Sequence, residues 1–205
     1  VGFFGEGTSY QFIKHGNYLY LGNNAGIIVA DIQNPLSPSV VTTVAVPGGN
    51  YQFYDLGVIG NYLYCRCGGA IEKIHIIDIS NPTTASFISS FGTYFYNTNL
   101  TTSGNYLFVT TEYYSGGGGN NFVAKLEIYS VATNPEDPEL VKIMFVRNSG
   151  YSQYGRVLVN GSAAYFVQGS ISPTSEFFVL DLSSLSGIIG PNDLVTLMVD
   201  GTIRS

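Results

Sequence analysis

The chain has 205 residues, of which 45% are hydrophobic and only 11% charged, and its formal net charge is −6. Eight Lys and Arg residues cannot form the basic surface that a nucleic-acid backbone requires, and no apolar run reaches the roughly 18 residues of a membrane helix. The 16 Tyr, 13 Phe and 25 Gly residues are typical of an all-β protein with aromatic strands and glycine turns.

A two-part phrase recurs along the chain. Its first part is an apolar run that opens on a Gly-Asn turn, and its second is an apolar run that ends in Asp-Ile-x-Asn-Pro. Copies begin at Gly16, Gly60 and Gly104, 44 residues apart, and a divergent copy begins at Gly161. A period in the forties made only of strands predicts a β-propeller of four-stranded antiparallel blades.

About four blades are expected, over residues 8–46, 51–92, 94–146 and 151–200. Within the second blade we expect strands at 51–58, 62–67, 74–79 and 87–91. Residues 1–7 and 194–199 both resemble outer strands, which leaves one more than a closed four-bladed ring needs. The chain begins at Val1 without Met, so we expect either a processed mature form or a piece of something longer. The surplus strand favours a segment of a larger propeller or a partial ring completed by another copy.

The turns of the repeat have local chemical reasons. Gly-Asn supplies the positive φ angles that a two-residue hairpin turn requires. Asp31, Asp78 and Asp181 stand at matched positions before the next turn. Because they recur once per blade, each is expected to accept a backbone N–H of its own turn rather than join a shared metal site.

The two cysteines, Cys65 and Cys67, lie two residues apart in a predicted strand and should share one face of it. A disulfide at that spacing would distort the strand, so both are expected to be free core residues. Only His15 and His75 could complete a metal site with them. We therefore predict no metal and no cofactor.

The phrases Ile76-Ile-Asp-Ile-Ser-Asn-Pro82 and Gly60-Asn-Tyr-Leu-Tyr64 resemble the LVIVD repeat, a family of extracellular and surface β-propeller repeats. The resemblance covers nearly all of the chain and is most specific in the first two copies. It implies four-stranded blades within larger secreted proteins. It implies no catalytic residues, because the family has no shared catalytic motif that matches this sequence.

Candidate ligand-binding residues follow from aligning the innermost strands. Five residues before each turn glycine stand polar residues, Gln11, Asp55, Asn99 and Arg156, and each is followed by an apolar one, Phe12, Leu56, Leu100 and Val157. Alternation places the two sets on opposite faces. We expect the apolar set to pack between blades and the polar set to line the mouth of the channel, with Tyr10 and Tyr54 nearby.

This polar ring has two interpretations. It is either a site for a small polar ligand, in which Asp55 and Arg156 supply opposite charges, or a solvent-filled channel whose polar groups satisfy one another. Neither His15 nor His75 falls on the ring, so no hydrolytic triad is predicted. Asp55 is its only carboxylate, which disfavours a paired-carboxylate mechanism.

Two further features are candidates. Tyr113 and Tyr114 open a glycine-rich stretch that ends at Asn121, which is either a surface insertion or a binding loop. Asn160 begins an Asn-Gly-Ser sequon at an exposed turn and is a candidate for glycosylation, whereas the Asn99 sequon would lie in the channel.

The sequence therefore predicts a non-catalytic extracellular or cell-surface propeller module that binds or scaffolds a protein or glycan, or that self-associates through blade edges. The alternative is a hydrolase or lyase acting on a carbohydrate or another small polar substrate at the channel mouth.

Overall fold

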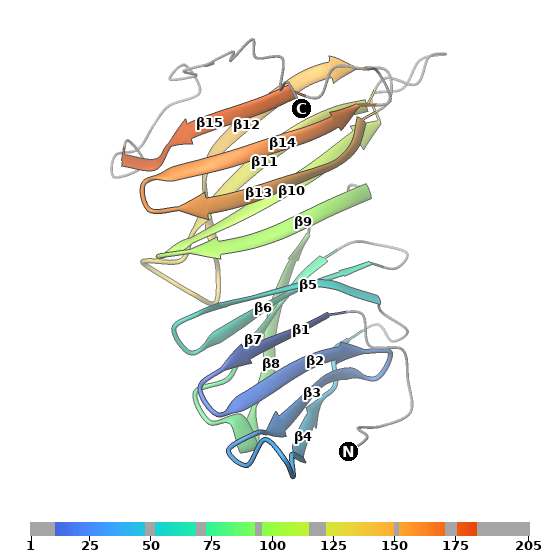
Figure 1. Ribbon diagram of the computed structural model, residues 1–205, viewed down its shortest axis with the longest axis vertical. Helices are drawn as coiled ribbons and strands as arrows, with labels where there is room; N and C mark the ends of the chain where they lie inside the picture. The colour runs from blue at the N-terminus through green and yellow to red at the C-terminus, as the bar shows by residue number, and fades with distance from the viewer. Residues whose placement is uncertain are drawn as a thin grey trace. The chain divides into compact units, whose positions relative to one another are not determined.

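The computed structural model describes residues 11–47, 52–68, 73–92, 96–114, 122–149, 152–170 and 176–183. These residues form antiparallel β-sheets and one short 3-10 helix, η1 (Pro82–Thr84) (Figure 1). The strands are β1 (Gln11–His15), β2 (Tyr18–Asn23), β3 (Gly26–Asp31), β4 (Ser39–Val44), β5 (Gln52–Ile59), β6 (Tyr62–Gly68), β7 (Lys73–Asp78), β8 (Ser86–Gly92), β9 (Tyr96–Ser103), β10 (Tyr106–Tyr114), β11 (Phe122–Ser130), β12 (Glu139–Ser149), β13 (Ser152–Asn160), β14 (Ala163–Ser170) and β15 (Glu176–Asp181).

Consecutive strands pair with each other in every sheet. The first sheet has the order β1-β2-β3-β4, the second β5-β6-β7-β8 and the third β9-β10-β11-β12, while the described part of the fourth is β13-β14-β15. The expected all-β fold of antiparallel four-stranded blades is thus confirmed. The two expected terminal outer strands, at 1–7 and 194–199, of which one is surplus, lie outside the described residues.

The turn chemistry of the repeat is as expected. Gly16, Gly60, Gly104 and Gly161 all have φ between +55° and +60°, a conformation that costs glycine little. The aspartates close the next turn: the Oδ1 atoms of Asp31, Asp78 and Asp181 accept the backbone N–H two residues later, at 2.7, 2.7 and 2.8 Å. The prediction that each aspartate accepts a backbone N–H of its own turn is confirmed.

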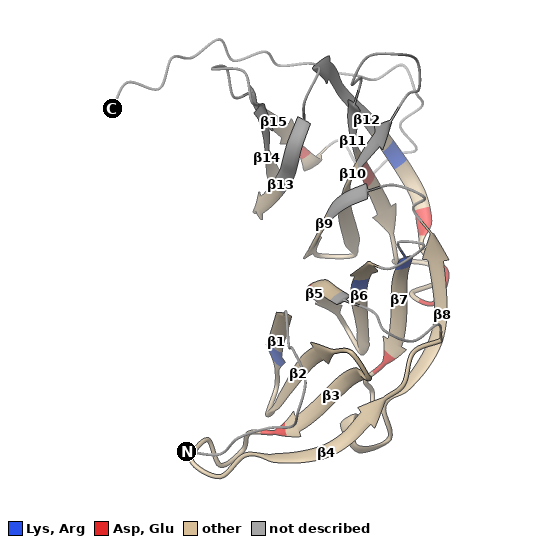
Figure 2. Cartoon of the chain, turned by 90° about the vertical axis from the view of Figure 1, so that its right-hand side faces the viewer, with Lys and Arg blue, Asp and Glu red and all other residues tan. Residues whose placement is uncertain are grey.

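The chain divides into two compact units, which are described separately. The first comprises Val1–Tyr94 with Val131–Pro138, and the second comprises Phe95–Ser130 with Glu139–Ser205. Charged residues are sparse on the described strands, in keeping with the composition (Figure 2). Within the described residues no helix is long and apolar enough to cross a membrane.

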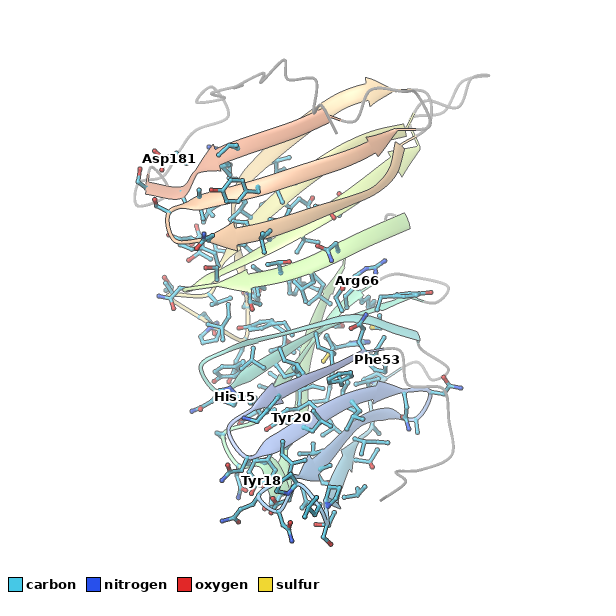
Figure 3. All side chains as sticks on the ribbon, in the orientation of Figure 1. His15, Tyr18, Tyr20, Phe53, Arg66 and Asp181 are labelled. Atoms are coloured by element: carbon cyan, nitrogen blue, oxygen red, sulfur yellow. The ribbon has the colours of Figure 1, made fainter. Side chains whose placement is uncertain are left out.

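In the first unit, one face of the first sheet packs against one face of the second. The buried cluster between them includes Tyr20 and Val29 from the first sheet and Phe53, Leu63 and Cys65 from the second. Tyr20 and Phe53 are among the labelled side chains of this unit in Figure 3. Burying such large aromatic and aliphatic side chains is the main force that holds the two sheets together.

The segment Val131–Pro138 fastens onto the second sheet through hydrogen bonds. The Tyr64 hydroxyl donates to the Pro135 carbonyl at 2.9 Å, and the Tyr62 hydroxyl donates to Glu136 Oε1 at 3.2 Å. Ser89 Oγ donates to the Glu136 carbonyl at 2.8 Å. Side chains of β6 and β8 thereby satisfy the backbone of this connecting turn.

In the second unit the third and fourth sheets pack in the same manner. Phe108, Leu126 and Ile128 of the third sheet contact Val157 and Ala164 of the fourth in a buried cluster. Both units therefore contain a sheet-on-sheet interface formed by equivalent faces of the repeat.

Cys65 and Cys67 are thiols buried in β6 and are not joined in a disulfide, as expected. Burial raises the pKa of the Cys65 thiol, and the neighbouring Cys67 raises it further. Cys65 therefore acts as a small apolar side chain in the core, while the Cys67 thiol donates to the Lys73 carbonyl at 3.4 Å.

Candidate functional site

The polar ring positions lie in register with a matched position on the second strand of each sheet. The Cα partners are Gln11 and Gly22, Asp55 and Arg66, Asn99 and Thr110, and Arg156 and Val167. In the last three sheets the register shifts immediately before the ring residue, as in a β-bulge. A bulge bends the strand and changes the direction of the adjacent side chain, and it commonly lies beside functional sites.

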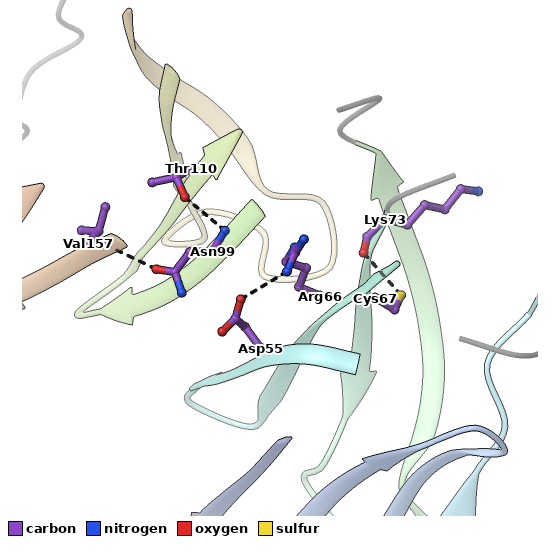
Figure 4. A network of polar contacts seen from close by, with 7 residues as sticks. All are labelled: Asp55, Arg66, Cys67, Lys73, Asn99, Thr110 and Val157. Carbon is purple, nitrogen blue, oxygen red and sulfur yellow. Dashed lines mark hydrogen bonds and ion pairs between the residues drawn. The ribbon is translucent and has the colours of Figure 1, made fainter. Parts of the chain in front are cut away.

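In the second sheet the ring residue forms an ion pair with its cross-strand partner. Asp55 Oδ2 lies 3.6 Å from Arg66 Nη1 (Figure 4), and the Arg66 side chain is only 7% exposed whereas that of Asp55 is 21% exposed. A guanidinium taken out of water requires a compensating charge, which Asp55 supplies.

Tyr54 lies over the same guanidinium. Arg66 Cζ is 4.7 Å from the centroid of the Tyr54 ring, within the range of a cation–π interaction. Tyr54 is the residue at the register shift between Phe53 and Asp55, and it is 36% exposed. Gly68 makes room for the ring, because a Cβ atom there would lie 2.4 Å from Tyr54 Cε2. Tyr54, Asp55 and Arg66 together form what we call the Tyr54 cluster.

The ring residue of the third sheet, Asn99, forms a hydrogen bond with the fourth sheet. The Asn99 backbone N–H donates to Thr110 Oγ1 at 3.1 Å, while its side-chain Oδ1 accepts from the Val157 N–H at 3.4 Å (Figure 4). Thr101 Oγ1 donates to the Val157 carbonyl at 3.0 Å. In the second unit, therefore, these polar groups join the inner strands β9 and β13.

The structure describes the positions of the other ring candidates only in part. Gln11 is exposed at the start of β1. Tyr10 and the side chain of Arg156 lie outside what the structure describes, and Asp55 and Arg156 belong to different units. The opposite charges expected from Asp55 and Arg156 stay a prediction, while the observed partner of Asp55 is Arg66.

One sequence expectation is wrong for the first sheet. Leu100 and Val157 are buried and Leu56 is partly buried, as the proposed packing between blades requires, but Phe12 is 69% exposed. In each unit this face of a sheet packs on the sheet that precedes it. Phe12 belongs to the first sheet, so no described sheet covers it.

Sequence reasoning also missed Arg66. Counting outward along both strands from the Gly60-Asn61 turn places Arg66 directly opposite Asp55. The hairpin alone would therefore have predicted this pair. An arginine between two core cysteines is itself unusual, since a buried arginine needs a partner.

The remaining candidates keep their status as predictions. Tyr113 and Tyr114 form the end of β10, in register with Val123 and Phe122, and thus belong to a strand rather than a loop. The glycines that follow them lie outside the described residues. Asn160 ends β13 and is exposed, next to Gly161 with its positive φ.

The histidines do not contribute to the ring. His15 is exposed at the end of β1. His75 is buried in β7, with its ring edge-on to Phe87 at a centroid distance of 5.6 Å. Burial, together with the charge of Lys73, lowers the pKa of His75 to about 4. Among the described residues no group of three His, Cys, Asp or Glu side chains could hold a metal ion.

Comparison with protein families identifies the repeat. The LVIVD repeat family matches residues 13–46 and 52–93, which are nearly all of the first and second sheets. These two sheets are LVIVD repeats. The match confirms the resemblance where the sequence phrase is most regular, and the third and fourth sheets repeat the same strand order and turn geometry as these LVIVD repeats.

Solved structures with a similar fold include designed and natural proteins. The computationally designed Ika4 protein has a TM-score of 0.53 at 15% identity, with 85% of this chain and 92% of that chain covered. Citrobacter koseri AztD has a TM-score of 0.57 at 15% identity, with 86% and 44% covered. A GH43 β-1,3-galactosidase has a TM-score of 0.52 at 9% identity, with 83% and 71% covered. At these identities the likeness extends to the β-propeller fold alone. No curated protein matches the sequence.

Proposed function

We propose that this LVIVD-repeat propeller is a non-catalytic binding module that recognises a glycan through the Tyr54 cluster. The observation that carries the proposal is the Asp55–Arg66 pair, with its 3.6 Å separation, beside the 36% exposed Tyr54 ring. A carboxylate already paired with a buried cation is a poor proton donor for catalysis. The same carboxylate is a well-positioned hydrogen-bond acceptor.

The chemistry of the cluster suits a sugar. A tyrosine ring held in place by a guanidinium offers an apolar surface on which a pyranose ring can stack, and its hydroxyl adds a hydrogen-bonding group. The partly exposed Asp55 oxygens can accept hydrogen bonds from sugar hydroxyls. The chain as a whole has few charged residues, so we propose a neutral ligand over a strongly ionic one.

We further propose that the module acts outside the cell or at its surface. The support is compositional: the chain has few charged residues and many Ser, Thr, Asn, Gly and Tyr residues, and residues 13–93 carry repeats of a kind associated with extracellular proteins. Protease treatment of intact source cells tests this location, since only a surface protein would be cleaved without lysis.

The test of glycan binding is a glycan array probed with the whole chain. We expect binding that falls at least tenfold in Tyr54→Ala and is unchanged in Leu36→Ala, whose side chain is 91% exposed on a turn of the first sheet. A folded protein that binds no glycan on the array would contradict the proposal, and a protein partner would then be the remaining candidate.

Because one similar structure is a galactosidase, hydrolysis is measured in parallel with aryl glycosides. We expect no turnover. Turnover that disappears in Asp55→Asn while folding is retained would establish a hydrolase at the channel mouth instead.

A further inference from the structure

Gly68 is a glycine whose backbone conformation does not require glycine. It ends β6, in register with Gln52 of β5. The turn glycines of the repeat, such as Gly60, have positive φ angles, whereas Gly68 is not among the described glycines of positive φ. Another L-amino acid could adopt the same backbone conformation without strain. Because a glycine within a strand weakens it, its presence indicates that another group approaches closely.

The framework of the repeat does not require glycine at this position either. Gly68 follows the turn glycine of its hairpin, Gly60, by eight residues. The residues at the same spacing in the first, third and fourth sheets are Asn24, Glu112 and Gly169. Since two of these have side chains, pairing of the strands is compatible with a larger residue. The reason for Gly68 therefore lies in the second sheet itself.

The group that approaches Gly68 is the ring of Tyr54. A Cβ atom at position 68 would lie 2.4 Å from Tyr54 Cε2 and 3.3 Å from both of its ring neighbours, Cδ2 and Cζ. The two neighbours are equally distant and much farther than Cε2, which places Gly68 beyond the Cε2 edge of the ring rather than over its face. Carbon atoms do not pack at 2.4 Å, so a side chain at position 68 would displace the ring.

Arg66 fixes the same ring from a second direction. Its Cζ atom lies over the face of the ring, 4.7 Å from the centroid. Arg66 and Gly68 are two residues apart on β6, and alternation places them on the same side of the strand. The Tyr54 ring thus has a cation against one face and the backbone of Gly68 at its edge. Together these two contacts set the direction in which its other face points.

We propose that Gly68 is the positioning residue of the glycan site: it lets the Tyr54 ring lie over Arg66, in the orientation in which the other face of the ring stacks on a sugar. This inference rests on the proposed glycan-binding function. Stacking requires the aromatic face to be presented at a fixed angle, and neighbours that lock a side chain supply that angle. Gly68 does not touch the ligand and acts through Tyr54.

Gly68→Ala tests the proposal in the whole chain, with Tyr54→Ala as the reference and Gly92→Ala as the matched control. Gly92 belongs to the same sheet, and a Cβ atom there would meet no atom within 4 Å. The Tyr54 ring is partly exposed and can swing outward, so Gly68→Ala is expected to fold with a urea midpoint near that of the wild type. On the glycan array, binding should fall about tenfold or more in Gly68→Ala and Tyr54→Ala, and remain at the wild-type level in Gly92→Ala.

An NMR signal of Arg66 reports the position of the ring without any glycan. An aromatic ring shifts the resonances of protons that lie over its face, so the Nε–H signal of Arg66, identified by its loss in Arg66→Lys, senses Tyr54. Gly68→Ala should move this signal close to its position in Tyr54→Ala, whereas Gly92→Ala should leave it in place. Adding Gly68→Ala to Tyr54→Ala should move it no further, because the ring through which Gly68 acts is absent.

Three results would overturn the proposal. The first is an Arg66 signal that Gly68→Ala does not move, because the ring would then keep its place beside a side chain. The second is a shifted signal with wild-type glycan binding, since the orientation of the ring would not matter for recognition. The third is a loss of folding in Gly68→Ala that the added Tyr54→Ala does not restore. A wild type that binds no glycan would overturn the proposed function, and the Arg66 signal separates that failure from a failure of Gly68 to hold the ring.

Discussion

Asp55 and Arg66 face each other across β5 and β6 as register partners, with Oδ2 and Nη1 3.6 Å apart. The pair forms at a point where the strand register shifts, and it brings Tyr54 over the guanidinium. The one carboxylate of the polar ring is therefore part of the second sheet's own structure. Tyr54 is left as the exposed aromatic group of the cluster, which is the basis for assigning binding rather than catalysis to it.

Tyr20 and Tyr64 occupy equivalent positions of the repeat, but we expect removal of their hydroxyls to have opposite effects on the free energy of unfolding. The Tyr64 hydroxyl donates to the Pro135 carbonyl, whereas the buried Tyr20 hydroxyl has no hydrogen-bond partner among the described residues. Burial raises the pKa of Tyr20 to about 12, so the hydroxyl stays neutral at physiological pH. Tyr64→Phe should lower the free energy of unfolding by about 1 kcal/mol. Tyr20→Phe should leave it unchanged or raise it by a similar amount, because an unsatisfied buried hydroxyl is removed. Urea unfolding of both variants measures the difference, and an equal loss in the two would contradict this account.

Gly22 is predicted to be intolerant of any side chain. A Cβ atom there would lie 2.3 Å from Phe53 Cβ, and Phe53 is fully buried, so its ring cannot move aside. Gly22→Ala should therefore destabilise the protein by about 2–3 kcal/mol, as overpacking of a core does. Gly92→Ala is the control, because a Cβ atom there meets no atom within 4 Å. Its thermal midpoint should match that of the wild type, and an equally tolerant Gly22 would show that the sheets pack less closely here.

His75 predicts a loss of stability in acid. Its pKa is about 4 in the folded protein, lowered first by burial and then by Lys73, against an ordinary value of 6.5. Between these values the unfolded chain binds a proton that the folded protein does not, so the free energy of unfolding falls as the pH is lowered from about 6.5 to about 4. At pH 7 and above His75 is neutral in both the folded and the unfolded chain, so this loss of stability is absent. The loss should be roughly 2 kcal/mol, allowing for partial screening.

The variant His75→Phe tests this, since Phe178 stands at the equivalent position of the fourth sheet. Its stability should fall less steeply than that of the wild type over the same pH range, as measured by urea unfolding. His15→Gln, at an exposed position, should keep the wild-type slope. A wild-type slope in His75→Phe would mean that His75 is already protonated in the folded protein at moderately acidic pH.

The repeat made much of this fold predictable because its turns are decided locally. Gly60 and Asp78 act within a few residues of themselves, and both do what the sequence indicates. Burial was predictable for Leu100 and Val157, but not the exposure of Phe12, because its own strand pattern cannot reveal whether a sheet precedes it. The pairing of Arg66 with Asp55 could have been predicted by counting residues along both strands from the hairpin turn. The register shift at Tyr54 could not, because a bulge leaves the alternation of the sequence almost unchanged.

The most direct test of the account is a double-mutant cycle on Asp55 and Arg66, with Asp55→Asn, Arg66→Met and the double variant compared with the wild type by urea unfolding. Each single change should destabilise the protein, with Arg66→Met the larger because the Arg66 side chain is more deeply buried and also contacts Tyr54. The coupling free energy should be about 1–2 kcal/mol, between the values for exposed and for fully buried ion pairs. Strictly additive effects, with no coupling, would show that Asp55 is not held by Arg66 and is available for another role, and would contradict the account.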